Sequence, residues 1–153
     1  MLNIVLHEPE IAMNTGNIGR TCSVTGSRLH LIRPLGFIID DRRLARAGMD
    51  YWHSLDVSFY ENFADFVHKN NDPKIYMVET NAQHTYSNIH FEKNAFIMLG
   101  SESAGIPAHI LQAYAETTIR IPMLKGSRSL NLASAAAVVI FETLRQHGFT
   151  NLS

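Results

Sequence analysis

The chain has 153 residues, of which 46% are hydrophobic and 18% charged, and its formal net charge is −1. This length is typical of a single domain, and the apolar fraction is sufficient for a packed core, which excludes a disordered chain. We therefore expect one domain over residues 1–153. Because the protein as a whole is not basic, any nucleic acid must bind through a local patch.

The single cysteine, Cys22, excludes an intrachain disulfide and fits a reducing compartment. The first ten residues, MLNIVLHEPE, lack the basic start and long apolar run of a signal peptide. No stretch approaches the roughly eighteen apolar residues that a membrane-spanning helix needs. These features predict a cytoplasmic protein without a membrane partner.

Short apolar runs alternate with segments of helical periodicity. We expect strands over Leu2–Leu6, Leu29–Ile32, Val57–Tyr60, Ile75–Val78, Phe96–Leu99 and Thr117–Ile121. We expect helices from a cap at Asn14 or Thr15 to Thr25, and over Arg42–Ala47, Phe63–Val67, Pro107–Ala115 and Leu132–Gln146. The runs at 75–78 and 96–99 are typical of strands buried on both faces. The pattern predicts an α/β fold with a mostly parallel sheet flanked by helices.

The last predicted helix, which Asn131 is expected to cap, is apolar nearly all round. One stripe comprises Leu132, Ala136, Val139 and Thr143, and the adjacent stripe comprises Ala133, Ala137, Ile140 and Leu144. Such a helix needs cover on more than one side. The pattern alone leaves two interpretations open, which are a helical dimer interface and a central core helix.

Three segments that follow predicted strands are candidates for ligand binding, because ligands bind beyond the carboxyl ends of parallel strands. The first is Asn14–Arg20, where small polar residues and glycines stand at an expected helix N-terminus. Such a terminus favours an anion such as phosphate, and Arg20 would add a cation. An ordinary capped helix with a surface arginine is the alternative.

The second segment, Gly100–Gly105, has two glycines five residues apart, as in a phosphate-binding loop. Ile106 and Pro107 replace the required Lys-Ser/Thr pair, which excludes a Walker A site. It is therefore either a close-approach loop with one carboxylate, Glu102, or a plain turn. The third segment, Ile121–Asn131, offers hydroxyl and N–H groups suited to a nucleotide-like ligand.

In this order and spacing, NTGNIGR, GSESAGIP and IPMLKGSRSLNLAS resemble the three motifs of the SPOUT methyltransferases. The resemblance is closest to the minimal YibK-like branch of tRNA (cytidine/uridine-34) ribose 2′-O-methyltransferases. The segments LNIVLHEPEIAMNTGNIGRTC, HLIRPLGF and DDRRLARAGMDYW extend it over essentially the whole chain. It implies methyl transfer from S-adenosyl-L-methionine to the ribose 2′-OH of nucleotide 34 in tRNA. The alternatives are another tRNA or rRNA nucleotide, or a non-catalytic RNA-binding protein.

The resemblance also implies a C-terminal trefoil knot that holds the cofactor, and a homodimer with the final helix at its interface. Main-chain groups of Ile121 and Leu130 are expected to contact the adenine. Arg20 matches the residue given the catalytic role, and Asn14 matches a partner near the transferred methyl. The cofactor-binding residues implied are Val78, Gly100, Glu102, Gly105, Ile121, Ser129, Leu130 and Asn131.

Two departures from the family pattern concern substrate detail more than cofactor binding. Relatives often read Gly-Pro-Glu-Thr where this chain has GSES at 100–103, and many read Asn-Leu-Ser-Asn where it has NLAS at 131–134. A ribose hydroxyl is a poor nucleophile, so its proton must be drawn off and its oxygen aligned. Because arginine normally stays protonated, we expect Arg20 to bind phosphate and stabilise negative charge, with proton removal by Arg20 as the alternative.

No metal is expected, since the eight histidines show no ligand spacing. RNA would need local basic groups, and the candidates are Arg42, Arg43 and Arg46 on one predicted helix and Lys125 and Arg128 in the third segment. A solvated surface is the alternative for each. Tyr51 and Trp52 are candidates for stacking on an anticodon base, or for a place in the core.

Overall fold

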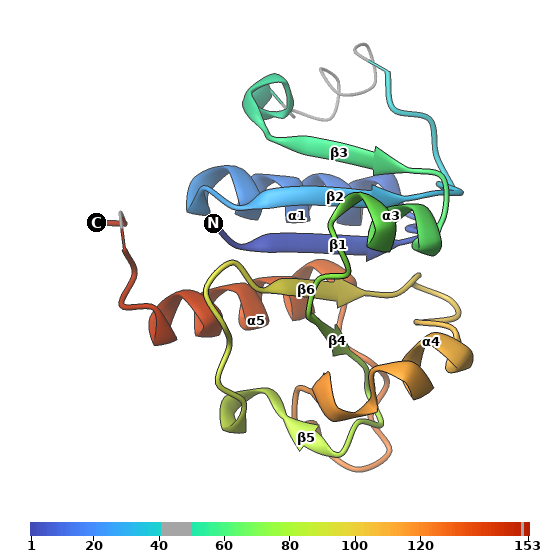
Figure 1. Ribbon diagram of the computed structural model, residues 1–153, viewed down its shortest axis with the longest axis vertical. Helices are drawn as coiled ribbons and strands as arrows, with labels where there is room; N and C mark the ends of the chain where they lie inside the picture. Colours follow the sequence, from blue (N-terminus) through green and yellow to red (C-terminus); the bar gives the residue numbers. More distant parts are fainter. Residues whose placement is uncertain (41–49, 151) are drawn as a thin grey trace.

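The computed structural model describes residues 1–40, 50–150 and 152–153. The strands of this part form one sheet in the order β3-β2-β1-β6-β4-β7-β5, and every pair of neighbours runs parallel (Figure 1). Their bounds are β1 Asn3–His7, β2 Arg28–Ile32, β3 Val57–Tyr60, β4 Ile75–Val78, β5 His84–Thr85, β6 Phe96–Leu99 and β7 Thr118–Arg120. The predicted parallel sheet is confirmed.

The core lies on both faces of the central strands. All five residues of β1 are buried, and they alternate between two apolar clusters, so that Ile4 and Leu6 contribute to one cluster and Val5 to the other. Side chains of successive strand residues point to opposite faces, which is why a run without polar positions forms a doubly covered strand. The runs at 75–78 and 96–99 form β4 and β6 as predicted.

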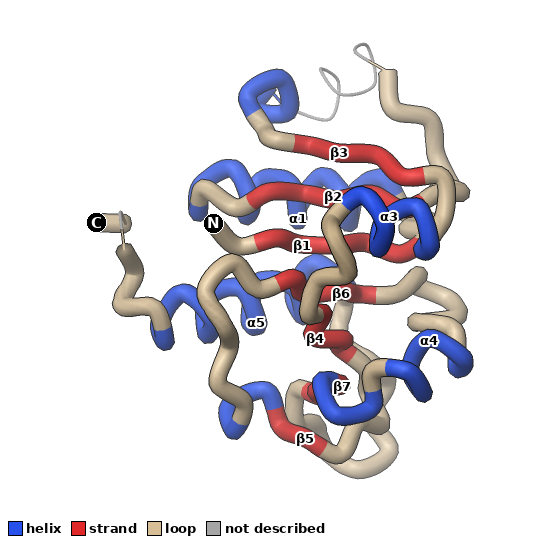
Figure 2. The backbone as a smooth tube through the Cα atoms, viewed as in Figure 1, coloured by secondary structure: helices blue, strands red, loops and turns tan. Residues whose placement is uncertain are grey.

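Helices cover both faces of the sheet (Figure 2). On one face, α1 (Ala12–Thr25) packs beside α5 (Leu132–Gln146), and both contribute to the first cluster. On the other face lie α3 (Phe63–Lys69) and α4 (Ala108–Ala113), which contribute Phe66 and Ile110 to the second cluster. Short 3-10 turns are η1 (Asp50–Ser54), η2 (Tyr86–Asn88) and η3 (Ala115–Thr117).

Strand β7 lies between β4 and β5, although it follows both in the sequence. The chain after β7 then leads through residues 121–131 to α5 on the α1 side. Near its end, the Gln146 side chain accepts a hydrogen bond from the Phe91 N–H (3.0 Å) and donates one to the Ile89 carbonyl (2.9 Å). The last helix is thereby fixed to the segment that precedes β6.

Helix α1 begins earlier than its sequence predicts. It starts at Ala12 with Ile11 at the N-cap, and no side chain of that residue caps it. Asn14 and Thr15 lie inside the helix and are buried, so the predicted cap is wrong. The reason is tertiary, because Asn14 uses its side chain for hydrogen bonds to residues of two distant segments.

The other helices follow the prediction with two qualifications. Helix α4 ends at Ala113, and η3 replaces its predicted last turn, while Pro107 occupies the N-cap. The predicted helix Arg42–Ala47 lies outside the described residues. Helix α5 has the predicted bounds, and the Asn131 side chain caps it by accepting hydrogen bonds from the N–H groups of Ala133 (2.9 Å) and Ser134 (3.3 Å).

One face of α5 is buried against the sheet and α1. Its buried residues are Ala136, Val139, Ile140 and Thr143. Val138 and Phe141 lie on the outer side, where they are 37% and 46% exposed. The described residues therefore cover α5 on one side only. The core interpretation applies to that side, and the dimer interface stays a prediction for the other side.

Candidate functional site

A pocket of about 520 Å³ lies where β4, β6 and β7 end. Its volume is within the range of about 300–1,000 Å³ that is common for small-molecule and cofactor sites. Its walls come from the segments after these three strands and from the starts of α1 and α5. The structure brings nine of the ten predicted site residues together in this lining, which are Asn14, Val78, Gly100, Glu102, Gly105, Ile121, Ser129, Leu130 and Asn131.

The Glu102 carboxylate connects the pocket to the start of α1. Its Oε2 accepts a hydrogen bond from the Glu10 N–H (2.7 Å), and its Oε1 accepts from the Ile11 N–H (3.2 Å) and from Asn14 Nδ2 (3.1 Å). A helix N-terminus favours negative charge. The anion predicted at this terminus is therefore supplied by the protein itself, so a phosphate bound at the N-terminus of α1 loses its main support.

A second link joins α1 to α5. Asn131 Nδ2 donates a hydrogen bond to Asn14 Oδ1 (2.9 Å), while Asn131 Oδ1 caps α5. The Asn14 amide thus donates to Glu102 with its nitrogen and accepts from Asn131 with its oxygen. Both ends of this side chain are occupied, which fixes its orientation in the pocket wall.

The 100–105 loop is closed by contact between its own ends. A Cβ built on Gly100 would lie 2.1 Å from the carbonyl carbon of Gly105, which no other residue at position 100 could accommodate without movement. Gly105 has a φ of +69°, and its N–H donates to the Ser101 carbonyl (2.9 Å). The close approach predicted for this loop therefore occurs between the backbones of Gly100 and Gly105 themselves.

A further carboxylate, which the sequence did not single out, holds this loop from outside. Glu10 accepts hydrogen bonds from the Ser103 N–H (2.8 Å) and from Ser103 Oγ (2.7 Å). Glu10 and Glu102 thus each accept a hydrogen bond from the backbone of the other's segment. Pairing between residues so far apart in sequence leaves no local pattern, so only the structure could identify Glu10.

All charged side chains that line the pocket in the described part of the chain are acidic. Two carboxylates, Glu79 and Glu102, belong to its lining, and no Lys, Arg or His is among the described residues that line it. Such a lining disfavours a phosphate deep in the pocket and suits a ligand with positive charge. Glu79 was missed by the motif comparison, and its signal is its place directly after a buried strand.

Arg20 is the one predicted site residue that does not line the pocket. It is exposed on α1, and its guanidinium carbon lies 5.2 Å from the centroid of the Tyr51 ring, a cation–π arrangement. The Tyr51 hydroxyl donates a hydrogen bond to the Gly16 carbonyl. Burial raises the pKa of Tyr51, although nearby Arg20 acts in the opposite direction, so the phenol keeps its proton.

Trp52 packs on the same helix. A Cβ on Gly19 would lie 3.1 Å from the Trp52 ring, and Trp52 is partly buried against the first cluster. The packing of η1 on α1 therefore supports the core interpretation of Tyr51 and Trp52 over base stacking.

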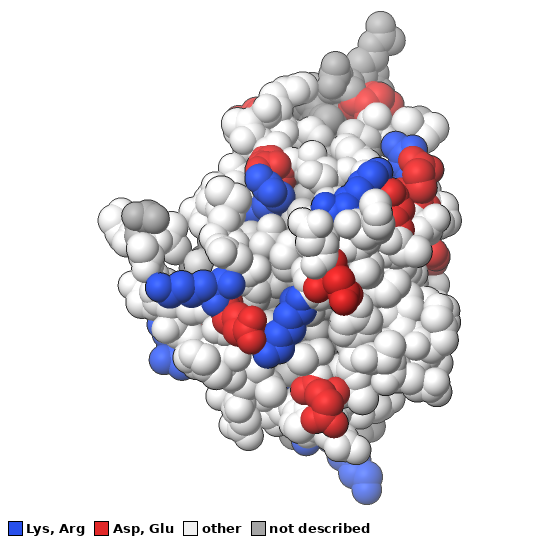
Figure 3. Space-filling view, in the orientation of Figure 1, with Lys and Arg blue, Asp and Glu red and all other residues white. Residues whose placement is uncertain are grey.

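Basic side chains near the pocket occur at Arg120, Lys125 and Arg128, all exposed. None of them forms an ion pair with another described residue, and Arg120 adds to the two residues predicted there. By contrast, basic and acidic groups adjoin one another on the face that carries α3 and α4 (Figure 3). Arg42, Arg43 and Arg46 lie outside the described residues.

Other chemistry is little represented in the described part of the chain. No group of three or more His, Cys, Asp or Glu residues is arranged there to hold a metal ion. No helix in the same residues has the length and apolar character required to cross a bilayer. Cys22 is buried, and desolvation raises the pKa of its thiol to about 12, so it is a packing residue and not a nucleophile.

The fold and the pocket define an α/β protein with a pocket of cofactor size at the carboxyl ends of the strands of a parallel sheet. Comparison with known proteins narrows this class. The profile of the SpoU rRNA methylase family matches residues 1–141. The chain belongs to this family.

Close relatives cover nearly the whole chain. A putative tRNA (cytidine(34)-2′-O)-methyltransferase of Listeria innocua is 47% identical over 96% of this chain and 89% of its own length. The tRNA (cytidine(34)-2′-O)-methyltransferase of Escherichia coli is 45% identical over 97% of this chain and 96% of its own. The crystal structure of a putative RNA methyltransferase from Bacillus anthracis superposes with a TM-score of 0.95 at 39% identity, covering 100% of this chain and 98% of that one.

Proposed function

We propose that this protein transfers a methyl group from S-adenosyl-L-methionine to the ribose 2′-OH of nucleotide 34 in tRNA. The observation that carries the proposal is the convergence of the eight cofactor-binding residues implied by the motifs in one pocket. The near full-length similarity to tRNA (cytidine(34)-2′-O)-methyltransferases supports the substrate.

The volume, lining and charge of the pocket support binding of this cofactor. Leu99, Ile121 and Leu130 offer apolar surface to a nucleoside, and the closed 100–105 loop presents backbone groups. The acidic lining suits a sulfonium, which is positively charged. When bound, the cofactor supplies an electrophilic methyl group. The residues proposed to hold it are Val78, Gly100, Glu102, Gly105, Ile121, Ser129, Leu130 and Asn131.

Arg20 and Asn14 have separate roles in this proposal. Arg20 binds an RNA phosphate and stabilises the negative charge that develops on the 2′-oxygen, which agrees with its exposed position outside the pocket. Asn14, held at both ends by Glu102 and Asn131, fixes the pocket wall that faces the reacting groups. Arg120, Lys125 and Arg128 attract the RNA backbone.

The protein is proposed to act as a homodimer through the outer side of α5. Val138 and Phe141 provide the exposed apolar surface that a second copy would cover. Phe141→Lys is expected to yield monomers in light scattering, whereas the exchange of an exposed residue far from α5, Phe59→Lys, is not. A monomeric unaltered protein would contradict this assembly.

The remaining architecture is proposed from the family. Residues 1–153 form one methyltransferase domain, and the C-terminal part forms a trefoil knot. The insertion of β7 between two earlier strands and the attachment of α5 to residues 89–91 support the knot. Tracing the chain in an experimental density map tests it. Since tRNA is the substrate, the proposed location is the cytoplasm, which cell fractionation tests.

The function is tested with the purified protein, labelled cofactor and two tRNAs that differ only in the 2′-hydroxyl of nucleotide 34. Label is expected in the natural tRNA and not in the 2′-deoxy form. Equal methylation of both would overturn the proposal and would point to another nucleotide, which mapping of the label identifies. Absence of any calorimetric heat with millimolar S-adenosylhomocysteine would instead favour a non-catalytic RNA-binding protein.

A further inference from the structure

Glu79 is a carboxylate in the pocket lining that accepts few hydrogen bonds from the described residues. It directly follows β4, and its N–H donates to the Ile119 carbonyl of β7 (2.9 Å), so its backbone position is fixed by the sheet. Its Oε1 accepts a hydrogen bond from the Thr80 N–H (2.7 Å). Its Oε2 lies 3.0 Å from the place where a Cβ on Gly105 would stand, so the carboxylate rests against the closed loop. No described residue donates to Oε2.

The second pocket carboxylate differs in this respect. Glu102 accepts three hydrogen bonds, two of them from the backbone N–H groups of Glu10 and Ile11, directly before α1. Its charge is therefore largely balanced by the helix terminus and the Asn14 amide. Since no described lining residue is basic, Glu79 supplies the negative charge that remains available to a ligand.

We propose that Glu79 makes the pocket discriminate between the methyl donor and its demethylated product. This inference rests on the proposed function. In the reaction the methyl–sulfur bond breaks, the new carbon–oxygen bond forms, and the 2′-hydroxyl proton passes to water. The sulfur keeps the electron pair of the broken bond, so the ligand loses one positive charge while its shape changes by one methyl group. A pocket can separate two ligands this similar far better by charge than by volume.

The attraction between Glu79 and the sulfonium does not depend strongly on how the ligand is oriented in the pocket. Coulomb attraction falls only with the inverse of distance, and it is strengthened where water is partly excluded. A neutral side chain at position 79 would weaken binding of the sulfonium donor and leave binding of the thioether product nearly unchanged. The natural carboxylate thus lowers product inhibition.

The test is isothermal titration calorimetry of the full chain with S-adenosylmethionine and with S-adenosylhomocysteine, at low salt and without tRNA. Glu79→Gln preserves the volume of the side chain and removes its charge. We expect the donor-to-product affinity ratio to fall about five- to tenfold in this variant, mainly through weaker donor binding. Glu79→Asp keeps the charge and is expected to retain most of the ratio.

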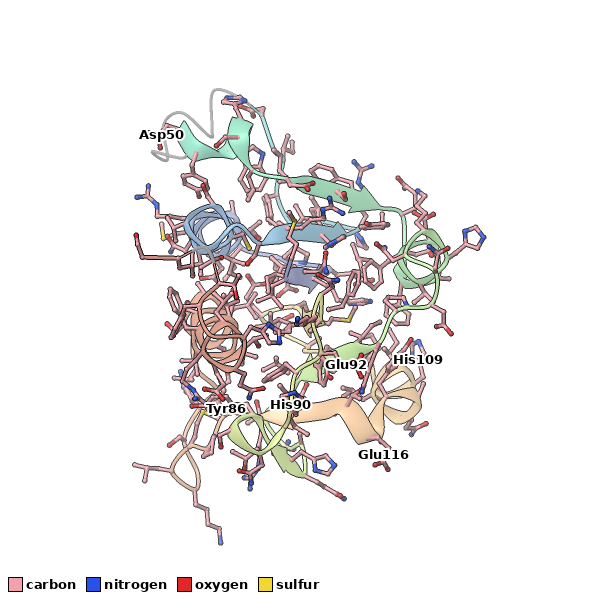
Figure 4. The ribbon with its side chains drawn as sticks, turned by 60° about the vertical axis from the view of Figure 1, so that its left-hand side comes forward. Asp50, Tyr86, His90, Glu92, His109 and Glu116 are labelled. Carbon is pink, nitrogen blue, oxygen red and sulfur yellow. The ribbon has the colours of Figure 1, made fainter. Side chains whose placement is uncertain are left out.

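Glu92→Gln is the matched control. Glu92, which is labelled in Figure 4, lies ahead of β6 at the amino ends of the parallel strands, opposite to the pocket, and pairs with Lys74 (2.6 Å). Its variant is expected to bind both ligands as the unaltered protein does. Added salt should lower the donor-to-product affinity ratio of the unaltered protein toward the ratio of Glu79→Gln, because salt screens the charge.

An unchanged donor-to-product ratio in Glu79→Gln would overturn the inference. Equal losses of affinity for both ligands would then indicate a hydrogen-bonding or structural role, and no loss for either ligand would show that the charge of Glu79 is irrelevant. If the unaltered protein bound neither ligand, the proposed function itself would be contradicted. Thermal unfolding of each variant establishes that it is folded before the titration.

Discussion

At the scale of residues, three polar side chains of the pocket wall are hydrogen-bonded to one another. Glu102, Asn14 and Asn131 form a continuous set of hydrogen bonds, and charged acceptors make such bonds stronger than neutral ones. The pocket is therefore held in shape by its own residues. Arg20 is not part of this set and lies outside the lining.

This separation predicts the phenotype of Arg20→Ala. Turnover with tRNA should be nearly abolished, because the phosphate contact and the stabilisation of the 2′-oxygen are lost. Cofactor affinity should stay within about twofold of the unaltered value, since the side chain does not reach the pocket. Single-turnover kinetics and calorimetry measure the two quantities separately.

Arg20→Lys is the informative companion. It keeps the charge but loses the planar fork, so a partial recovery of rate is expected. A large loss of cofactor affinity in Arg20→Ala would contradict the role assigned to this residue.

At the scale of elements, the start of α1 is the point where sequence and structure differ most. Asn14 and Thr15 are good caps by residue type, and the apolar periodicity began near them. The helix nevertheless begins at Ala12, because Glu102, which lies in a distant segment, accepts hydrogen bonds from the N–H groups of Glu10 and Ile11. No local pattern contains that information.

Other elements show the same limit. The two-residue β5 has no apolar run of its own and forms because His84 and Thr85 pair with β7. By contrast, the long runs of β4 and β6 and the capped α5 were predictable, since each carries its own periodicity or cap. The three segments that carry most of the pocket residues were predictable from their places after strands, whereas the roles of single residues came only from the resemblance to a family. Glu10 was missed because its role arises from tertiary placement, and Glu79, which directly follows a buried strand, lies outside the matching motifs.

The contact between Glu10, which precedes α1, and Ser103 of the 100–105 loop gives a prediction at the scale of elements. Glu10→Gln should weaken cofactor binding about three- to tenfold, because a charged acceptor for both Ser103 donors becomes neutral. Ser103→Ala removes the hydroxyl and should have a smaller effect of the same sign. In the double variant the losses should be less than additive, since both act on one contact.

Ser103→Thr serves as the control, because it retains the hydroxyl and the N–H. Calorimetric affinities of the four proteins complete the cycle. Strictly additive losses would show that Glu10 does not act through Ser103.

At the scale of the whole molecule, the side chain of a buried histidine in β2 connects the neighbouring strands β1 and β3. His30 is 1% exposed; its Nδ1 lies 2.8 Å from the Tyr60 hydroxyl and its Nε2 lies 3.1 Å from Asn3 Oδ1. Burial, reinforced by Arg28 and partly opposed by Asp56, lowers its pKa to about 4. The fold therefore requires the neutral ring.

Stability should consequently depend on pH. Below the ordinary histidine pKa of about 6.5 the unfolded chain binds a proton at position 30 that the folded protein excludes, so the free energy of unfolding falls as pH decreases. The loss should accumulate between about pH 6.5 and pH 4 and reach roughly 3 kcal/mol from this group. Urea unfolding at a series of pH values measures it.

The exchange His30→Gln should flatten this dependence, because the amide can donate and accept without titrating. A residual slope of the same sign is expected from His7, whose pKa burial also lowers. An undiminished slope in His30→Gln would assign the pH dependence to other groups.

The hydrogen bonds among Asn14, Glu102 and Asn131 also bear on how this protein can evolve. Each residue satisfies a donor or acceptor of another, so a single exchange leaves a partly buried polar group unmatched and is disfavoured by itself. Although the three positions lie far apart in the sequence, we expect selection to act on them jointly. In aligned relatives they should remain fixed together or change together, which makes their covariation a record of this contact.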